Sequence, residues 1–110
     1  MKTSKVLRTG ELTGVALDWA VAKCEGLLHD DGTVSDYWQP SELWEQGGPI
    51  IEREKISVLD ANGCWGARKK YWDNSRSSRD YFGPTPLIAA MRCYVASKMG
   101  DEVDIPKELI

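Results

Sequence analysis

The chain has 110 residues, a formal net charge of −3 and a hydrophobic fraction of 42% that includes five tryptophans. This length and composition predict one globular domain over residues 1–110, and they exclude a disordered adaptor. No apolar run approaches the ~20 residues of a membrane-spanning helix, and no charged-then-apolar leader opens the chain. We therefore expect a cytoplasmic protein without a membrane partner.

Metal and cofactor chemistry have no recognisable motif in the sequence. The three cysteines, Cys24, Cys64 and Cys93, are odd in number, and no pair has the spacing of metal ligands. The aspartates between residues 28 and 39 do not alternate as the ligands of a calcium loop do. We therefore expect three reduced thiols, no metal and no cofactor.

The N-terminal part predicts a strand and a helix. Residues 2–8 mix basic and apolar side chains, as a short edge strand does. A helix is predicted over residues 13–25, because Thr13 can cap its start and Gly26 can end it. The side chains assigned to its core face are Leu17, Ala20, Val21 and Cys24, with Trp19 at the margin. Those assigned to its solvent side are Glu11, Asp18 and Glu25.

The central stretch is polar at first and then helical in short pieces. Residues 28–39 predict an exposed loop that contains the only histidine, His29. Helical turns are predicted over residues 41–54, with Gly47-Gly48-Pro49 as an interruption between them. A Gly-Gly-Pro turn could cradle a phosphate, but the spacing and the Lys-Ser/Thr of a P-loop are missing. An enzyme is therefore the weakest functional hypothesis.

Asn62-Gly63 is the clearest β signal, because this pair favours the two-residue turn of a hairpin, predicted here over residues 56–70. The turn places Val58 opposite Ala67. The residues assigned to the core face are Ile56, Val58, Trp65, Ala67 and Tyr71. The residues assigned to the other face are Leu59, Cys64, Gly66, Arg68, Lys70 and Trp72.

The best-marked helix is predicted over residues 85–99. Thr85 can cap it, Pro86 fits the first helical position, and Gly100 can end it. Its apolar stripe consists of Leu87, Ile88, Met91, Tyr94, Val95 and Met99, and its small residues are Ala89, Cys93 and Ala96. The residues left to solvent are Arg92, Ser97 and Lys98. Such a helix needs cover from several sides, either within the chain or from a second copy in a homodimer.

Taken together, these elements predict an α+β fold. Two main helices pack together on a small antiparallel sheet that includes a β-hairpin. Beyond the last helix, Ile105 and Leu109 either pack back onto the core or fray.

Residues 68–82 combine positive charge with aromatic rings. This segment contains five basic and two acidic residues, a local charge of +3, and four aromatic residues are interleaved with them. Cationic and aromatic side chains can follow a phosphate backbone and stack on bases. The candidate nucleic-acid contacts are Arg68, Lys70, Trp72, Arg76 and Arg79. The alternative is a strand end and a solvated loop whose aromatic rings turn inward.

Three stretches resemble one protein family. They are LTG with ALDWAVA over residues 12–22, QGGPIIERE over 46–54 and GPTPLIAAMRCYVA over 83–96. They resemble the NinX-type proteins of lambda-like phages and enterobacterial prophages, a family of unknown function, and more distantly small phage domains described as α/β/α sandwiches. The resemblance implies an accessory protein made inside an infected or lysogenic bacterium, with no established activity, substrate or catalytic residue.

Two functional hypotheses follow. The leading one is a non-enzymatic module that binds a host or phage protein, with Trp44 among the candidate contacts, because aromatic residues are in surplus and no catalytic motif occurs. The alternative is weak binding of single-stranded nucleic acid through residues 68–82.

Overall fold

The computed structural model describes residues 3–69 and 80–110. Its elements in chain order are β1 (Ser4–Arg8), η1 (Thr9–Glu11), α1 (Gly14–Glu25), α2 (Trp44–Glu54), β2 (Ile56–Asp60), β3 (Trp65–Lys69), β4 (Asp80–Gly83), α3 (Pro86–Met99), β5 (Glu102–Pro106) and η2 (Lys107–Leu109). Within these residues, three α-helices and two antiparallel sheets confirm the α+β class. No helix in the two ranges is long and apolar enough to cross a membrane.

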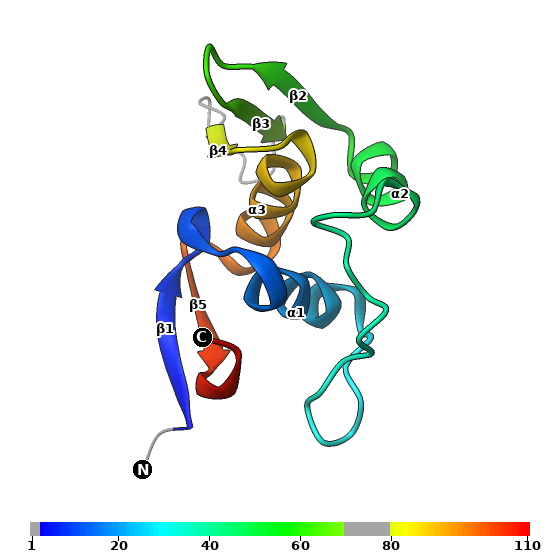
Figure 1. Ribbon diagram of the computed structural model, residues 1–110, viewed down its shortest axis with the longest axis vertical. Coiled ribbons are helices and arrows are strands. Elements are labelled where there is room, and N and C mark those ends of the chain that lie inside the picture. Colours follow the sequence, from blue (N-terminus) through cyan, green and yellow to red (C-terminus); the bar gives the residue numbers. More distant parts are fainter. Residues whose placement is uncertain (1–2, 70–79) are drawn as a thin grey trace.

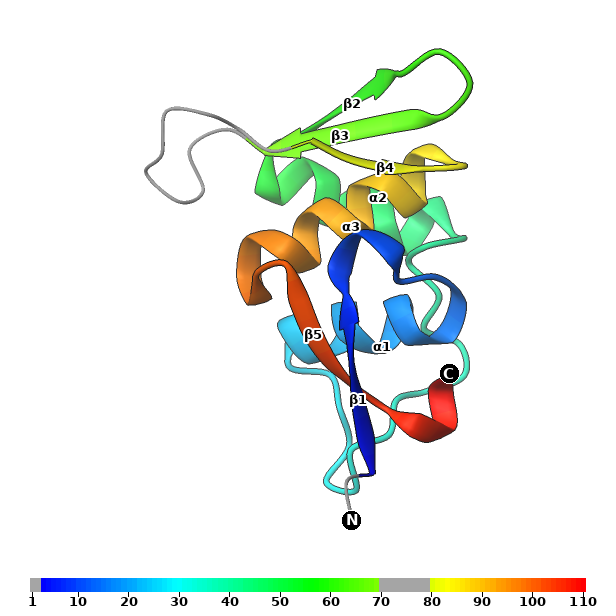
Figure 2. The same ribbon diagram turned by 90° about the vertical axis from the view of Figure 1, so that its left-hand side faces the viewer.

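Helix α3 lies in the middle of the molecule (Figures 1 and 2). The sheet with the strand order β2-β3-β4 covers one side of α3, and α1 packs on the opposite side. Helix α2 lies beside α3, and the ribbon of β1 and β5 lies next to α1. The prediction that α3 is covered from more than one side is confirmed, and its own chain supplies this cover. The homodimer stays a prediction.

The ends of α3 follow the signals in its sequence. The Thr85 Oγ1 atom accepts a hydrogen bond from the backbone N–H of Ile88 at 3.1 Å, and Pro86 is the first helical residue. Gly100 ends the helix with a φ of 87°, which favours glycine. Arg92, predicted to be solvated, is instead half-buried, because its guanidinium donates hydrogen bonds to the carbonyls of Leu12 and Phe82, both at 2.7 Å.

The hairpin has the predicted register. Val58 pairs with Ala67, and the Ala61 N–H donates to the Cys64 carbonyl at 2.9 Å across the turn. Ile56 and Ala67 are buried on the side that faces α3, as expected.

One assignment on the core face of the hairpin is wrong. Trp65 is 37% exposed, because it is the first residue of β3 and lies beside the exposed hairpin turn. Tyr71 lies outside the described residues. On the outer face, the exposed side chains of Leu59 and Phe82 flank Gly66, and the Phe82 ring occupies the space beside that glycine. This face of the sheet therefore carries apolar surface.

Helix α2 corrects the prediction for the central stretch. The helix runs without interruption from Trp44 to Glu54, and Pro49 lies inside it. Pro49 is exposed and removes only one backbone hydrogen bond. Gly47 is buried, and a Cβ atom there would lie 2.4 Å from the Pro40 carbonyl oxygen and 2.6 Å from Leu87 Cδ2. The lack of a side chain at Gly47 therefore lets Pro40 and Leu87 of α3 pack closely against α2. Gly47 does not break the helix.

The N-terminal strand is confirmed, and its partner is the tail. β1 pairs antiparallel with β5, from Ser4 opposite Pro106 to Arg8 opposite Glu102. Of the two outcomes expected for the tail, the structure shows the packed one, because Ile105 is fully buried and Leu109 packs against the core.

Candidate functional site

The loop between α1 and α2 folds back over α1 and buries a carboxylate. Asp18 was assigned to the solvent side of the helix, but it is only 5% exposed. Its Oδ1 atom accepts a hydrogen bond from the backbone N–H of Ser41 at 2.9 Å, and its carbonyl accepts one from the Trp38 indole at 3.1 Å. The assignment failed because residues 38–41 cover that side of the helix, where the polar pattern had predicted water.

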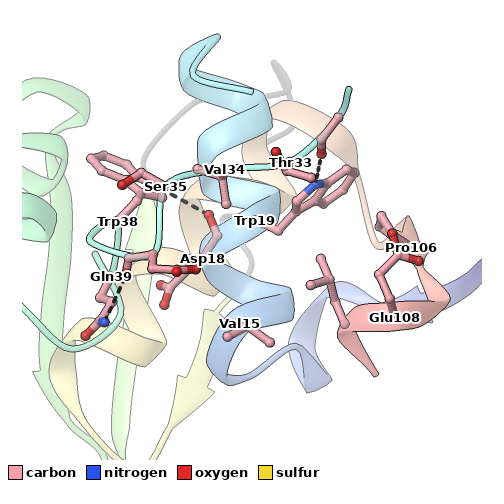
Figure 3. Close-up of a pocket in the computed structure, with 13 residues that line it drawn as sticks. Val15, Asp18, Trp19, Thr33, Val34, Ser35, Trp38, Gln39, Pro106 and Glu108 are labelled. Carbon is pink, nitrogen blue, oxygen red and sulfur yellow. Dashed lines mark hydrogen bonds between the residues drawn. The ribbon is translucent and has the colours of Figure 1, made fainter. Parts of the chain in front are cut away.

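A cavity of about 270 Å³ lies between α1, this loop and the C-terminal turn η2 (Figure 3). The rings of Trp19 and Trp38 stand on either side of Asp18. The Trp19 indole N–H donates to the Gly32 carbonyl at 2.9 Å. Since the Trp38 indole N–H is also bonded to a carbonyl, hydrogen bonds help to fix both rings against the cavity wall.

The charge of the cavity is negative. Asp18, Asp36 and Glu108 line it, together with apolar side chains such as Val15. Burial raises the pKa of Asp18 above its ordinary value, and this effect outweighs the opposing interactions with the Ser41 side chain and the Ser41 backbone N–H. Sequence reasoning missed this site. A usable signal was the apolar sequence on both sides of Asp18, because residues 16–22 are all buried.

A second surface surrounds Trp44, which is 57% exposed in the first turn of α2. Its ring lies near Gly48, one turn further along, at 3.9 Å from where a Cβ atom would be. An open groove of about 420 Å³ runs between Trp44 and the start of α3, where Pro86 and Ile88 line it together with Glu42. The groove is therefore apolar, with an acidic side chain beside it.

The basic segment is described only at its two ends. Lys70, Trp72, Arg76 and Arg79 lie outside the described residues.

Arg68 forms an ion pair with Asp80 across β3 and β4, with 3.0 Å between Nη2 and Oδ2. Of the aromatic residues, Phe82 is 49% exposed on the outer sheet face, and Tyr81 packs against the core and donates a hydrogen bond to Asp101. Trp44 and Arg68 belong to different surfaces, because the Trp44 groove borders the start of α3 whereas Arg68 pairs with the opposite end of β4.

The charged end of α2 has a structural explanation. Glu54 forms ion pairs with Lys69 at 2.7 Å and with Lys98 at 3.4 Å, and these tie α2 to β3 and α3. Arg53 binds Glu25 of α1 at 2.6 Å, and Tyr94 donates a hydrogen bond to the same carboxylate. Four elements meet in this network.

The cysteines are free thiols. Burial raises the pKa of Cys24 to about 11 and that of Cys93 to about 12, so both stay protonated at neutral pH. Neither is a candidate nucleophile.

Comparison with known protein families gives a match over most of the chain. The family model described as Bacteriophage P22, NinX matches residues 8–98, which include α1, α2, the hairpin and all of α3 except its last residue. No curated protein matches the chain. The resemblance predicted from the three sequence stretches is confirmed.

Proposed function

We propose that this chain, which belongs to the NinX family of bacteriophage proteins, acts by binding a phage or host protein through the groove beside Trp44. The observation that carries the proposal is the exposure of Trp44 in an apolar groove. Tryptophan is enriched among the residues that dominate the binding energy of protein interfaces, above all where it fills a pocket.

The other described tryptophans make Trp44 stand out. Trp19 and Trp38 are bonded through their indole N–H groups to backbone carbonyls inside the fold. Trp65 is the next most exposed, at 37%, beside the hairpin turn. Trp44 presents more of its ring to solvent than any of these.

The residues that line the groove indicate which kind of partner segment would bind there. Pro86 and Ile88 provide apolar walls, while Glu42 and Glu45 are exposed on either side of Trp44 in the sequence. A partner segment that matches this surface is apolar at its centre and basic at its ends, because opposite charges favour encounter and register.

The test is a tagged pull-down from phage-infected cells, with recovered proteins quantified for the wild type, Trp44→Ala and Tyr37→Ala. Tyr37 is the matched control, because it is an aromatic residue that is 86% exposed and does not line the groove. We expect Trp44→Ala to weaken binding of the recovered partner by roughly 30-fold or more, the effect of an interface hot spot. The Tyr37→Ala variant should bind within about twofold of the wild type, as a residue outside an interface does.

The proposal fails if Trp44→Ala retains the partner at wild-type strength. Circular dichroism and thermal unfolding of the purified variant establish that it is folded, so a lost partner cannot be attributed to a lost fold.

Binding of single-stranded nucleic acid is the second candidate. The exposed Phe82 ring favours it, because an aromatic ring on an open sheet face can stack on a base. The ion pair between Arg68 and Asp80 disfavours nucleic-acid binding, because the guanidinium is already paired with a carboxylate. Fluorescence anisotropy with a labelled oligonucleotide at low salt tests it, and Phe82→Ala should weaken any binding without changing its salt dependence.

A further inference from the structure

We propose that the cavity between α1 and the α1–α2 loop binds a cationic group, an alkylammonium or a guanidinium, at the carboxylate of Asp18. This site is distinct from the Trp44 groove, so it does not depend on the function proposed above. Three features of the cavity carry the proposal: its charge, its buried carboxylate and its aromatic walls (Figure 3).

The charge of the cavity selects the sign of the ligand. Asp18, Asp36 and Glu108 line it, and no Lys, Arg or His is among the described residues that do. Such a cleft with low-dielectric walls concentrates cations and repels anions.

The buried carboxylate provides the hydrogen-bond acceptor. The Oδ1 atom of Asp18 accepts the Ser41 N–H at 2.9 Å, and the Ser41 side chain also lies beside the carboxylate. Both partners are neutral, and a carboxylate with so little exposure favours a charged donor. A bound cation would also stabilise the ionised form against the burial that raises the Asp18 pKa.

The aromatic walls add cation–π attraction. Tryptophan is the best aromatic partner for a cation, and the Lys23 ammonium already lies 5.4 Å from the centre of the Trp19 ring. Trp38 provides a second ring on the other side of Asp18. With a volume of about 270 Å³, the cavity accommodates a small amine or a single basic side chain, and it is too small for a nucleotide-sized ligand.

Two sources could supply this chemistry: a free small amine, or a Lys or Arg side chain of a protein. The test therefore has two arms, both read from the indole N–H signals of Trp19 and Trp38 in ¹H–¹⁵N correlation spectra. The first arm titrates n-butylammonium and n-butylguanidinium, with n-butanol as the neutral isostere of n-butylammonium. The second arm titrates a capped Gly-Arg-Gly peptide, with its citrulline analogue as the neutral control.

We expect the cations to shift both indole signals saturably and the neutral isosteres to leave them in place. Stronger binding of the peptide than of the free guanidinium assigns the site to a protein side chain, and the reverse order assigns it to a free small amine. Equal shifts with n-butanol would overturn the proposal, because the cavity would then be merely apolar. Absence of saturable shifts at roughly 50 mM ligand, where even millimolar affinity saturates, would overturn it as well.

Asp18→Asn is the decisive variant, because its amide oxygen can still accept the Ser41 N–H while the charge is gone. We expect cation binding to weaken by roughly 10- to 100-fold, the loss of one charge-assisted hydrogen bond. Asp31→Asn is the matched control. Asp31 lies in the same loop, and its carboxylate binds Thr33 and does not line the cavity. Equal binding by the two variants would contradict the proposal.

A second variant tests the site even if Asp18→Asn does not fold. Val15 is 63% exposed where α1 borders the cavity, so Val15→Arg should fold and place its own guanidinium in the site. We expect this variant to lose at least tenfold in affinity for added cations. If it binds them as the wild type does, the cavity is not the site. Trp44→Ala should leave cation binding unchanged, which separates this site from the protein-binding groove.

Discussion

Helices α2 and α3 lie side by side, yet different forces define them. α3 begins with a capping threonine and a proline at its first position, and glycine ends it. α2 begins after Leu43 without a side-chain cap, contains two glycines and a proline, and ends at Lys55 with a φ of 55°. Local sequence signals therefore specify α3, whereas contacts with the rest of the fold specify α2.

The largest expected effect tests the α3 half of this comparison. Met91 is fully buried in the middle of α3. We expect Met91→Ala to lower the free energy of unfolding by ~2–4 kcal/mol, because it leaves a cavity where several elements meet. Urea unfolding measures this loss. A change below about 1 kcal/mol, which is ordinary for a surface residue, would show that α3 is not the centre of the core.

The two glycines of α2 form a matched pair with opposite expected signs. A Cβ atom at Gly47 would overlap the Pro40 carbonyl and Leu87, whereas at Gly48 its nearest neighbour is the Trp44 ring at 3.9 Å. We expect Gly47→Ala to destabilise by ~1–3 kcal/mol through overpacking. Gly48→Ala should stabilise by ~0.5–1 kcal/mol, because alanine favours a helix where there is room.

Thermal and urea unfolding of the two alanine variants provide the comparison. If both variants gained stability, α2 would be a helix limited only by propensity, and the contrast with α3 would be lost.

The remaining expected effect depends on pH and concerns the end of α2. The hydrogen bond from Lys69 lowers the pKa of Glu54 from 4.5 to about 2. Because the folded-state pKa is the lower one, this stabilisation is present above pH 4.5 and is lost as the pH falls from 4.5 toward 2. We expect Glu54→Gln to lower the free energy of unfolding by ~1–2 kcal/mol at neutral pH. The loss is no larger because two of its partners, Arg53 and Lys98, are partly exposed and solvent screens their charges.

Urea unfolding at neutral and acidic pH checks this expectation. The difference between Glu54→Gln and the wild type should shrink as the pH approaches 2. Glu52→Gln is the control, because Glu52 is exposed on the same helix. A Glu52 variant with the same pH response would mean that the Glu54 ion pairs do not anchor α2.

What could be predicted from the sequence follows the same division. The α3 boundaries and the register of Val58 opposite Ala67 were predictable, because caps and the Asn62-Gly63 turn act through neighbouring residues. The continuity of α2 could not be predicted, because it depends on the space that Gly47 leaves beside Pro40. Long-range contacts of this kind leave no periodic trace in the sequence.

The candidate sites divide in the same way. The aromatic identity of Trp44 was visible, but its exposure depends on how α2 lies against the start of α3. The Asp18 cavity was missed because the loop that buries Asp18 is polar and looks solvated in sequence. The apolar sequence on both sides of Asp18 indicated burial, but it did not identify the residues that cover the carboxylate.

The pairing of β1 with β5 has a consequence for the order of assembly. It joins segments from opposite ends of the chain, and closing a loop of this length costs an unfolded chain ~4 kcal/mol of entropy. Because packing of α1 against α3 brings β1 and β5 closer together, we expect the ribbon to form after the two helices have docked. Before β5 pairs with β1, the strand that contains the exposed Val6 has an unpaired edge. Such an edge can pair with the strands of other chains.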